Sequence, residues 1–550
     1  MTDTPKIEAA AYELNPSFPM YADRRALWLN WYDFPREDPA HPEVYTYTDS
    51  LSYDPGDEVA FHVSSTAAAY SIEVVRDGLR PESVHRSGDL RGAFHPTPKT
   101  AYKTGCEWPA AHRWQIPKTM PSGFYRVISR CLNARGSPFL QHHGFVVRPT
   151  PATRGGRLLM ILPTATWTAY NDWGGANHYE GIDGPQGNNF SPELSLRRPW
   201  SRGIIWLPQG APRIGTVPKP APGDVPRYSV KEWAYAHAYA RYYAASGWAQ
   251  YDRLFLIWAQ REGFGVDVIT QTDLHYRPEI LEDYACATIV GHDEYWSRRM
   301  RENLDAYVEG GGRFARFGAN FLWQIRLEDE GRKQVCYKYR ARAEDPLRDT
   351  DQRALLSSAW EDTLIDWPGA TTVGVNGFRG VYTGFGGFNP RNSMGFTVYR
   401  PQHWAFAGTD LYYGDVFGAE ARIFGYEVDG LDYTFRGGLP FPTHADGAPP
   451  NVEILAMNVA TCSEEAHGAE GADYYVLDAD LDFKVLVLEG EATEAAKDKH
   501  RFGSGMIVHM PKGRGEVFTA ATCEWVMGLK LGDYYTEQIT RNVLKRFCER

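Results

Sequence analysis

The feature that most constrains the fold is a continuous apolar run, RLLMILPT at residues 157–164, which opens a series of alternating strand and helix patterns. A run that is apolar at every position suits a parallel strand buried on both faces of a sheet. The same half of the chain predicts strands at 265–273, 285–291 and 313–320 and helices at 230–263, 278–284 and 297–311. Strands that alternate with helices favour an α/β sheet.

The regions on either side have different patterns, and together they predict four segments. Residues 1–150 carry short alternating strands separated by turns, which predicts an N-terminal β-sandwich. Residues 151–369 form the first part of an α/β domain, 370–490 a Gly- and Tyr-rich β insertion, and 491–550 a strand and helix that complete the domain. We therefore predict an α/β fold: a doubly wound, Rossmann-like (glutamine-amidotransferase-like) domain with a β-rich insertion, preceded by a β-sandwich.

The net charge and the cysteine content exclude some classes of function. The formal net charge of -11 leaves no basic field to hold phosphates, which argues against a nucleic-acid partner. No apolar run approaches the roughly 20 residues of a membrane span, and the first residues lack the pattern of a signal peptide. The seven cysteines are scattered without a CxxC pair. We expect a cytoplasmic protein with no membrane partner.

The residues that could carry chemistry follow the predicted strands. In open α/β sheets, ligands bind beyond the carboxyl ends of the strands. Three such ends run into TWTAYNDWGGANHY (166–179), HDEYWS (292–297) and GANFLWQ (318–324), and so offer Tyr170, Asn171, His292, Asp293, Glu294, Tyr295 and Asn320 to one crevice. A further carboxylate, Glu427, lies in GYEVDG (425–430) of the predicted insertion.

Each of these residues also has a purely structural interpretation. Glu294 could cap the helix that starts near Ser297, Asn320 could make a turn, and Tyr170 could be an ordinary loop aromatic. His292 could be a satisfied core histidine, and Glu427 a solvated loop carboxylate. GxSxG, GxGxxG and P-loop motifs are absent, and the third strand tip has no cysteine nucleophile. The cluster therefore favours metal-assisted hydrolysis over covalent catalysis.

Four motifs carry a resemblance to a known family. They are TWTAYNDWGG (166–175), GHDEYWS (291–297) with the following Met300 and Arg301, FGANFLWQIR (317–326) and GYEVDG (425–430). With these motifs in this order, the chain resembles the catalytic C-terminal part of the large (β) subunit of N,N-dimethylformamidase.

The resemblance implies an amidohydrolase with a mononuclear iron (Fe3+) held by two tyrosines and one glutamate. Tyr170 and Glu294 match two of the ligands, and His292, Asn320 and Glu427 match active-site residues that do not bind the metal. The implied partners are a small amide substrate and a small partner subunit, and we expect a homo-oligomer. Phenolate and carboxylate oxygens are hard anionic donors that suit Fe3+.

The second tyrosine ligand departs from the family pattern. It is expected between Trp200 and Tyr228, yet residues 197–215 (RRPWSRGIIWLPQGAPRIG) contain no tyrosine. Tyr228 is the candidate in that interval, and Tyr179 is the alternative. If neither serves, the site holds another metal or none. A second hypothesis is therefore a non-catalytic or carbohydrate-binding protein on a degenerate hydrolase scaffold, and a third is a glutamine-amidotransferase-like domain with a different nucleophile.

Overall fold

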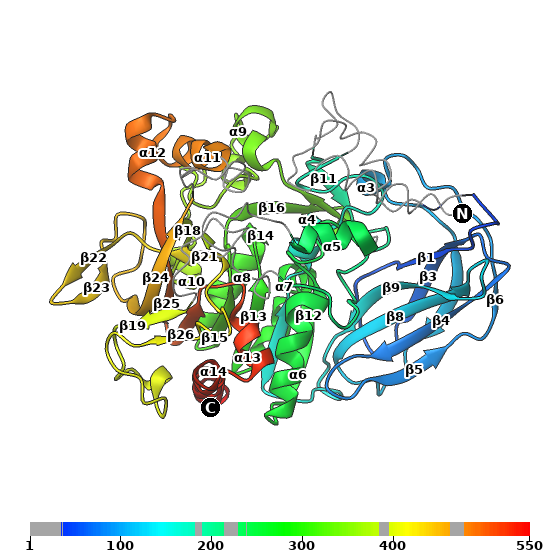
Figure 1. Ribbon diagram of the computed structural model, residues 1–550, viewed down its shortest axis with the longest axis horizontal. Helices are drawn as coiled ribbons and strands as arrows, with labels where there is room; N and C mark the ends of the chain where they lie inside the picture. Colours follow the sequence, from blue (N-terminus) through cyan, green and yellow to red (C-terminus); the bar gives the residue numbers. More distant parts are fainter. Residues whose placement is uncertain are drawn as a thin grey trace.

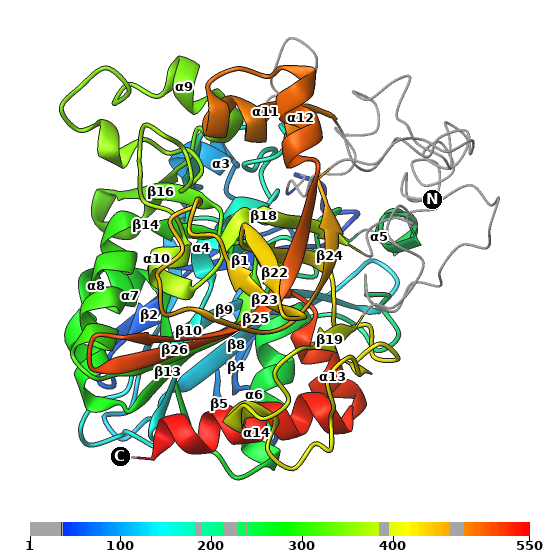
Figure 2. The ribbon, with the colours of Figure 1, turned by 90° about the vertical axis from the view of Figure 1, so that its left-hand side faces the viewer.

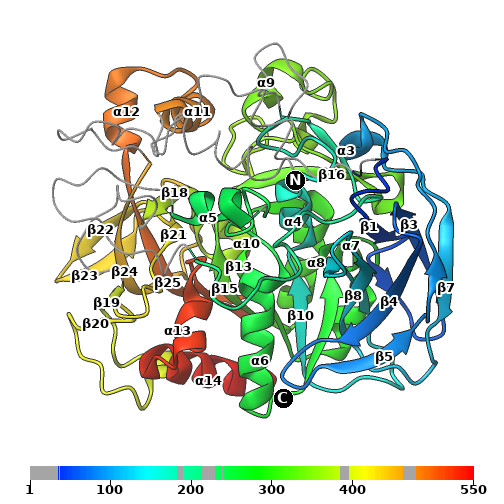
Figure 3. The same cartoon turned by 45° about the vertical axis from the view of Figure 1, so that its right-hand side comes forward.

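The computed structural model describes residues 35, 37–181, 190–213, 229–237, 239–383, 395–462 and 478–549. Figure 1 shows the N-terminal strands, in blue, at one side of the molecule and the yellow and orange strands of the second half at the other, and Figure 3 shows the same separation from another angle. Figure 2 shows α11 (Asp478–Glu489) and α12 (Glu494–His500) at the end of the molecule opposite α14 (Tyr534–Cys548). The functional candidates lie between these parts.

The N-terminal strands form two sheets that share one core. The first is three-stranded, in the order β1 (Val44–Thr48), β3 (Glu58–Ser65) and β7 (Ala110–Gln115). The second is six-stranded, with β2 (Ser52–Tyr53), β9 (Pro138–Val147), β8 (Gly123–Leu132), β4 (Ala69–Arg76) and β5 (Glu82–Arg86), and with β6 (Leu90–Arg91) beside β4. Alternating apolar residues of β3 and β4 enter the same buried cluster. The segment boundaries at 150, 369 and 490 stay a prediction.

The central element is an eleven-stranded sheet. Its order is β12 (Val266–Thr270), β10 (Leu158–Leu162), β13 (Cys286–His292), β15 (Arg313–Ala319), β26 (Gly515–Ala520), β25 (Phe502–Lys512), β24 (Glu453–Thr461), β18 (Asn376–Thr383) and β21 (Tyr426–Gly430), with β19 (Phe396–Val398) and β20 (Val416–Phe417) joined beside β24. The pairs from β12 to β26 are parallel. From β26 onward the pairs are antiparallel.

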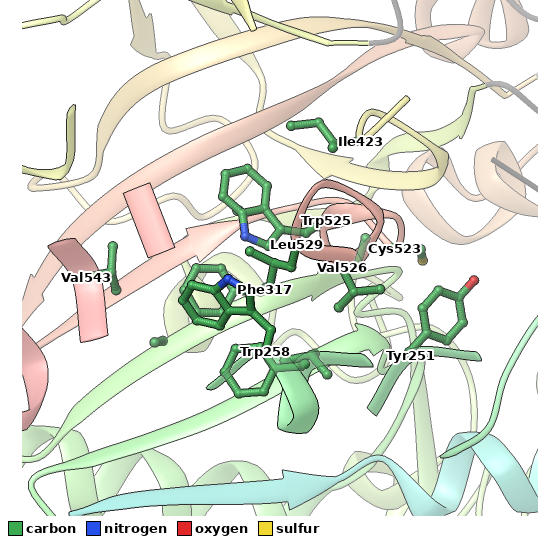
Figure 4. Packing of buried hydrophobic residues seen from close by; sticks show 14 of the residues in the cluster. Tyr251, Trp258, Phe317, Ile423, Cys523, Trp525, Val526, Leu529 and Val543 are labelled. Atoms are coloured by element: carbon green, nitrogen blue, oxygen red, sulfur yellow. The ribbon is translucent and has the colours of Figure 1, made fainter. Parts of the chain in front are cut away.

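Both faces of the parallel part are covered, as the apolar run at 157–164 predicts. Leu158, Met160 and Leu162 of β10 enter one core cluster, and Leu159 and Ile161 enter the other. The first face is covered by α6 (Arg253–Arg261), α13 (Trp525–Leu531) and α14, and the second by α7 (Gln271–Tyr276), the 3-10 helix η3 (Pro278–Asp283) and α8 (Arg298–Glu309). Figure 4 shows the residues of α13 packed over Phe317 and Trp258.

The prediction of a doubly wound, Rossmann-like α/β fold is wrong. The sheet is mixed, and among the described residues strand exceeds helix, at 33% against 25%. The strands of the predicted insertion, 370–490, do not form a separate unit, because β18, β19, β20, β21 and β24 all join the central sheet through β25. The cause is the antiparallel pairing of β25 with β26, in which Lys512 faces Gly515. A hairpin at this point turns a parallel sheet into an antiparallel one.

The long helix predicted at 230–263 is also broken. The structure has α5 (Ser229–His237), a five-residue π-helix η2 (Trp248–Asp252) and α6. Gly247 interrupts the helical path with a φ of 119°, and a Cβ there would lie 2.4 Å from the carbonyl oxygen of Ile204. The close approach of the 204 backbone therefore requires glycine at this position.

The remaining elements are short. A four-stranded sheet of β11 (Glu193–Ser195), β17 (Lys333–Val335), β16 (Trp323–Glu328) and β14 (Tyr295–Ser297) lies beyond the ends of the parallel strands, and β22 (Tyr433–Arg436) pairs with β23 (Leu439–Pro442). The other helices are α3 (Ala101–Thr104), α4 (Thr164–Tyr170), α9 (Ala341–Glu344) and α10 (Ala370–Val373). Within the described ranges, every helix is too short or too polar to cross a bilayer.

Two buried histidines predict how stability depends on pH. Burial lowers the pKa of both His143 and His178 to about 3, below the usual 6.5. The unfolded chain therefore binds more protons than the native protein between these values, so the free energy of unfolding falls as pH drops below 6.5. Each histidine contributes up to about 1.4 kcal/mol per pH unit.

Urea unfolding at pH 7.5, 6.5 and 5.5 measures this slope. His143→Gln keeps an acceptor for the backbone N–H of Thr48, which donates to His143 Nε2 at 3.3 Å. This variant is expected to flatten the slope, and equal slopes in the variant and the wild type would refute the assignment.

Candidate functional site

The parallel strands bring the predicted site residues to one edge. β13 and β15 pair in register, with His292 opposite Ala319, so Glu294 and Asn320 leave their strands at the same end. β10 ends at the same edge and leads through α4 to Tyr170. β21 approaches from the antiparallel side, because Val428 bridges to Thr522 just beyond β26.

Three oxygen-bearing side chains meet at the tip of β13. The Tyr170 hydroxyl donates to Glu294 Oε2 at 3.0 Å. The Tyr179 hydroxyl lies 2.6 and 2.8 Å from the two carboxylate oxygens of Glu294 and 2.8 Å from the Tyr170 hydroxyl. The two phenol rings stack with their centroids 4.5 Å apart. Two phenols and one carboxylate therefore occupy one small, buried volume.

This donor set fits a hard, highly charged cation. Burial and then Glu294 raise the pKa of both Tyr170 and Tyr179 well above the ordinary value of 10, so these phenols stay protonated when only protein surrounds them. A bound cation would replace those protons and supply the positive charge that three anionic oxygens need. Oxygen donors of this kind suit Fe3+, so the residues present fit the group that the sequence resemblance implies.

Neighbouring groups hold this arrangement in place. Trp323 Nε1 donates to Glu294 Oε1 at 2.7 Å, and the Tyr295 hydroxyl donates to the Tyr179 hydroxyl at 3.0 Å. Tyr295, one of the residues offered to the crevice by the strand ends, therefore contacts the site through Tyr179. These contacts fix the carboxylate of Glu294 and the phenol of Tyr179.

The loop that carries Tyr179 is fixed by a buried arginine. Arg198 is 1% exposed, and its guanidinium donates to the carbonyl oxygens of Asn171, Trp173 and Ala176. A guanidinium can satisfy several carbonyls of an irregular loop at once, which a shorter donor cannot do. Arg198 therefore positions the segment between Tyr170 and Tyr179.

A second charged pair lies beside the oxygen cluster. His292 Nε2 is 2.8 Å from Glu427 Oε2 and 3.4 Å from Glu294 Oε2, while Nδ1 lies 2.8 Å from the carbonyl oxygen of Ala245. Burial opposes the charging of His292, but Glu427 and then Glu294 outweigh it and raise its pKa to about 9. Burial raises the pKa of Glu427, and the facing His292 limits that rise. The pair can hold or move a proton at these atoms.

Asn320 completes this side of the site. Its backbone has a φ of 66°, and its amide group lies 3.3 Å from His292 Nε2 and hydrogen-bonds Glu427. Its backbone N–H donates to Asp429 Oδ1 at 2.8 Å, which fixes the turn in this uncommon conformation. The side chain thus faces the His292–Glu427 pair, as the sequence predicts.

A buried ion triad fastens β21 to the parallel strands. Arg316 of β15 pairs with Asp293 at 2.7 Å and with Asp429 at 2.8 Å, and all three side chains are fully buried. The aspartates of the HDE and EVD motifs are therefore structural, whereas the glutamates face the site. Because Asp429 and Glu427 share one strand, the triad sets the position of Glu427.

Lys338 is a functional candidate that no feature of the sequence predicts. Its ammonium is fully buried, makes no hydrogen bond within the described part of the chain, and lies 3.3 Å from the ring centroid of Tyr179. Burial lowers the pKa of Lys338 to about 8, while Glu294 opposes this shift. It stands alone between aromatics in CYKYR (336–340), so no motif points to it.

The tip of β26 contributes a further residue. Cys523 is fully buried, its N–H donates to the carbonyl oxygen of Glu427, and its ligand atom lies within 4.8 Å of those of His292 and Glu427. The rule that placed candidates at three strand ends also applies to this fourth end, so the sequence contained a signal for Cys523.

The structure brings together His292, Glu294, Asn320, Glu427 and Tyr170. Tyr228 lies outside the described residues. Tyr179, the alternative, reaches the cluster. Trp200, in the RPW sequence, is buried away from it against Trp167 and His143, with ring centroids 6.1 Å from each.

Comparison with known proteins gives one family and one curated relative. The family described as "N,N-dimethylformamidase beta subunit-like, C-terminal" matches residues 71–540. The N,N-dimethylformamidase beta subunit of Paracoccus aminophilus is 24% identical over 320 residues, which is 53% of this chain and 36% of that protein. The match therefore spans about a third of the length of this relative.

Two solved structures each match a fifth of this chain. A sporulation control protein, Spo0M, from Bacillus subtilis matches 20% of this chain and 51% of its own at 18% identity, with a TM-score of 0.15. Domain 1 of VCBP3 from Branchiostoma floridae matches 20% of this chain and 98% of its own at 12% identity, with a TM-score of 0.15.

Proposed function

Because the chain belongs to the N,N-dimethylformamidase beta subunit-like, C-terminal family, we propose that it is a hydrolase that cleaves the C–N bond of a small amide. Water adds to the amide carbonyl and the C–N bond breaks, which gives a carboxylic acid and an amine. The observation that carries the proposal is the meeting of Tyr170, Tyr179 and Glu294 beside the His292–Glu427 pair. Two phenol oxygens and a carboxylate that can ligate a metal, together with a proton-holding pair, are the parts that metal-assisted hydrolysis requires.

Tyr170, Tyr179 and Glu294 would hold a mononuclear Fe3+ ion. When bound, the ion would act as a Lewis acid toward the carbonyl and increase the acidity of water. Glu427 would accept the proton that the water loses, since its carboxylate faces His292 Nε2, which itself lies 3.4 Å from Glu294. His292 and Asn320 orient the carbonyl and the leaving amine, with the His292 ring held by the Ala245 carbonyl at Nδ1 and both side chains held by Glu427.

Lys338 supports the charge of this cluster. Its ammonium faces the ring of Tyr179, and a buried cation at that place favours the negative charge that the phenol and Glu294 carry together. Lys338 therefore acts on the donors and does not need to touch the amide.

The same proposal covers the partner subunit, the oligomer, the cellular compartment and the substrate class. The relative from Paracoccus aminophilus is named as a beta subunit, which supports a small partner subunit for this chain. We further propose a homo-oligomer in the cytoplasm. The substrate class is a small amide, because the site residues are buried and aromatic rings enclose them.

Glu427→Gln tests the assigned proton acceptor. Glutamine keeps the size and the contact with Asn320 but cannot accept a proton, so kcat for amide hydrolysis is expected to fall by about 10²–10⁴-fold while bound iron stays unchanged. Amine release from N,N-dimethylformamide and metal analysis of the same sample measure both. Unchanged kcat in an iron-loaded variant would remove Glu427 from this role.

A wild-type chain that binds iron yet releases no amine from any small amide would instead favour the second candidate, a ligand-binding protein. The observation behind that candidate is the indole of Trp200 in the segment expected to supply a tyrosine.

A further inference from the structure

A second group of metal-binding side chains lies away from the candidate site. The ligand atoms of His403, Glu453 and His509 all lie within 4.8 Å of one another. His403 precedes the 3-10 helix η7 (Trp404–Phe406), while Glu453 and His509 face each other across β24 and β25. None of these residues belongs to the cluster around Glu294.

The two histidine rings are spaced for a shared ion. His403 Nε2 and His509 Nδ1 are 3.2 Å apart. Two nitrogen ligands of one tetrahedral zinc, with bonds of about 2.0–2.1 Å, lie roughly 3.3 Å apart. The present separation therefore requires little movement of either ring.

His509 already has the outer partner typical of a metal-binding histidine. Its Nε2 lies 3.0 Å from Glu516 Oε2, so the ring donates its proton to that carboxylate and leaves the Nδ1 lone pair directed at His403. A carboxylate behind a histidine fixes the tautomer and makes the free nitrogen a better ligand.

His403 is neutral, but it must give up one hydrogen bond in order to bind a metal ion. Its Nδ1 accepts a hydrogen bond from the N–H of Ala405 at 3.2 Å, so its proton is on Nε2 and is directed at His509. Binding an ion through Nε2 moves that proton to Nδ1 and gives up the bond from Ala405. The first turn of η7 is therefore the part that adjusts on binding.

Arginines surround the two carboxylates. Glu453 pairs with Arg400 at 3.1 Å, and Glu516 pairs with Arg546 at 3.2 Å and with Arg313 at 3.5 Å. The Glu453 side chain is 45% exposed, so its carboxylate can turn from Arg400 to an ion that arrives from solvent. A divalent ion would add positive charge beside three arginines and two carboxylates, which favours weak, exchangeable binding.

We propose that His403, His509 and Glu453 form a second metal site, for a zinc-class divalent ion, that links η7 to the β24–β25 pair. Two imidazole nitrogens and one carboxylate oxygen suit Zn2+ and leave a fourth position for water. Such an ion would join the loop before η7 to the antiparallel half of the central sheet.

Equilibrium dialysis of the chelator-treated full chain against Zn2+ tests this proposal. The wild type is expected to bind one more zinc per chain than His403→Gln or Glu453→Gln. Glu516→Gln, which removes only the outer partner, is expected to weaken zinc binding by about 10–100-fold. Because Glu453 is half exposed, Glu453→Gln tests the site without a risk to folding.

Two controls separate this site from other zinc-binding groups. His85→Gln alters another histidine pair, in which the two Nε2 atoms lie 2.8 Å apart, and is expected to leave the zinc count unchanged. Glu294→Gln alters the candidate active site and is expected to retain this zinc. Anomalous diffraction at the zinc edge should give a peak between His403 and His509. No peak there, or equal zinc in wild type, His403→Gln and Glu453→Gln, would overturn the proposal.

Discussion

Replacing Glu294 with glutamine is expected to remove bound iron and to lower kcat/KM for amide hydrolysis by at least about 10²–10³-fold. Glu294 is the one carboxylate shared by Tyr170 and Tyr179, and it also accepts from Trp323. Glutamine has the same shape but contributes no negative charge, so the remaining phenols lose their common anionic partner. The loss should therefore affect metal binding and activity together.

Metal analysis, amine release and a thermal melt of the same preparation distinguish this outcome from unfolding. Glu279→Gln, at a side chain that is 60% exposed, is the matched control and should behave as the wild type. Full iron content in folded Glu294→Gln would remove Glu294 from the ligand set.

The second large effect is expected from Asp429→Asn, which should destabilise the fold by about 3–5 kcal/mol. Asp429 accepts from Arg316 at 2.8 Å and from the N–H of Asn320 at 2.8 Å, and its side chain is fully buried. The variant leaves the guanidinium of Arg316 with one carboxylate, Asp293, in a water-free interior. It also loosens the strand that carries Glu427.

Urea unfolding monitored by tryptophan fluorescence measures the change. Arg316→Met combined with Asp293→Asn and Asp429→Asn removes all three charges, and it should recover part of the stability, since no unpaired charge stays buried. A loss below about 1 kcal/mol in Asp429→Asn would mean that the triad does not hold β21 in place.

The parallel strands could be predicted from the sequence because a strand that is buried on both faces is apolar at almost every residue. The runs at 157–164 and 285–291 correspond to β10 and β13, and the loss of apolar residues after them marks the functional edge. The sequence pattern does not show in which direction the other strands run. Whether β25 pairs parallel or antiparallel with β26 depends on the hairpin between Lys512 and Gly515, and the pattern within each strand is the same in both cases.

The site residues likewise divide into those that could be predicted from the sequence and those that only the structure shows. His292, Glu294 and Asn320 directly follow parallel strands, so the strand-end rule alone places them together. Tyr179 lies only nine residues after Tyr170, in the stretch that follows the first parallel strand, but only the folded loop shows that its hydroxyl reaches Glu294. Lys338 opens the 3-10 helix η5 (Lys338–Arg340), far along the chain, and only tertiary packing against Tyr179 and Trp323 brings it to the site. Asp293 and Asp429 show the converse, since two acidic residues inside the motifs prove to be structural partners of Arg316.

The most direct test of the site is the visible absorption of the iron-loaded protein in wild type, Tyr179→Phe and Tyr228→Phe. Iron bound by phenolates gives a charge-transfer band, and the three forms differ only in which phenol can contribute. We predict the same band in wild type and Tyr228→Phe, and a weakened, shifted band in Tyr179→Phe, in which Tyr170 is the one remaining phenolate. An unchanged band in Tyr179→Phe together with a loss in Tyr228→Phe, or no band in the iron-loaded wild type, would contradict the metal site built from Tyr170, Tyr179 and Glu294.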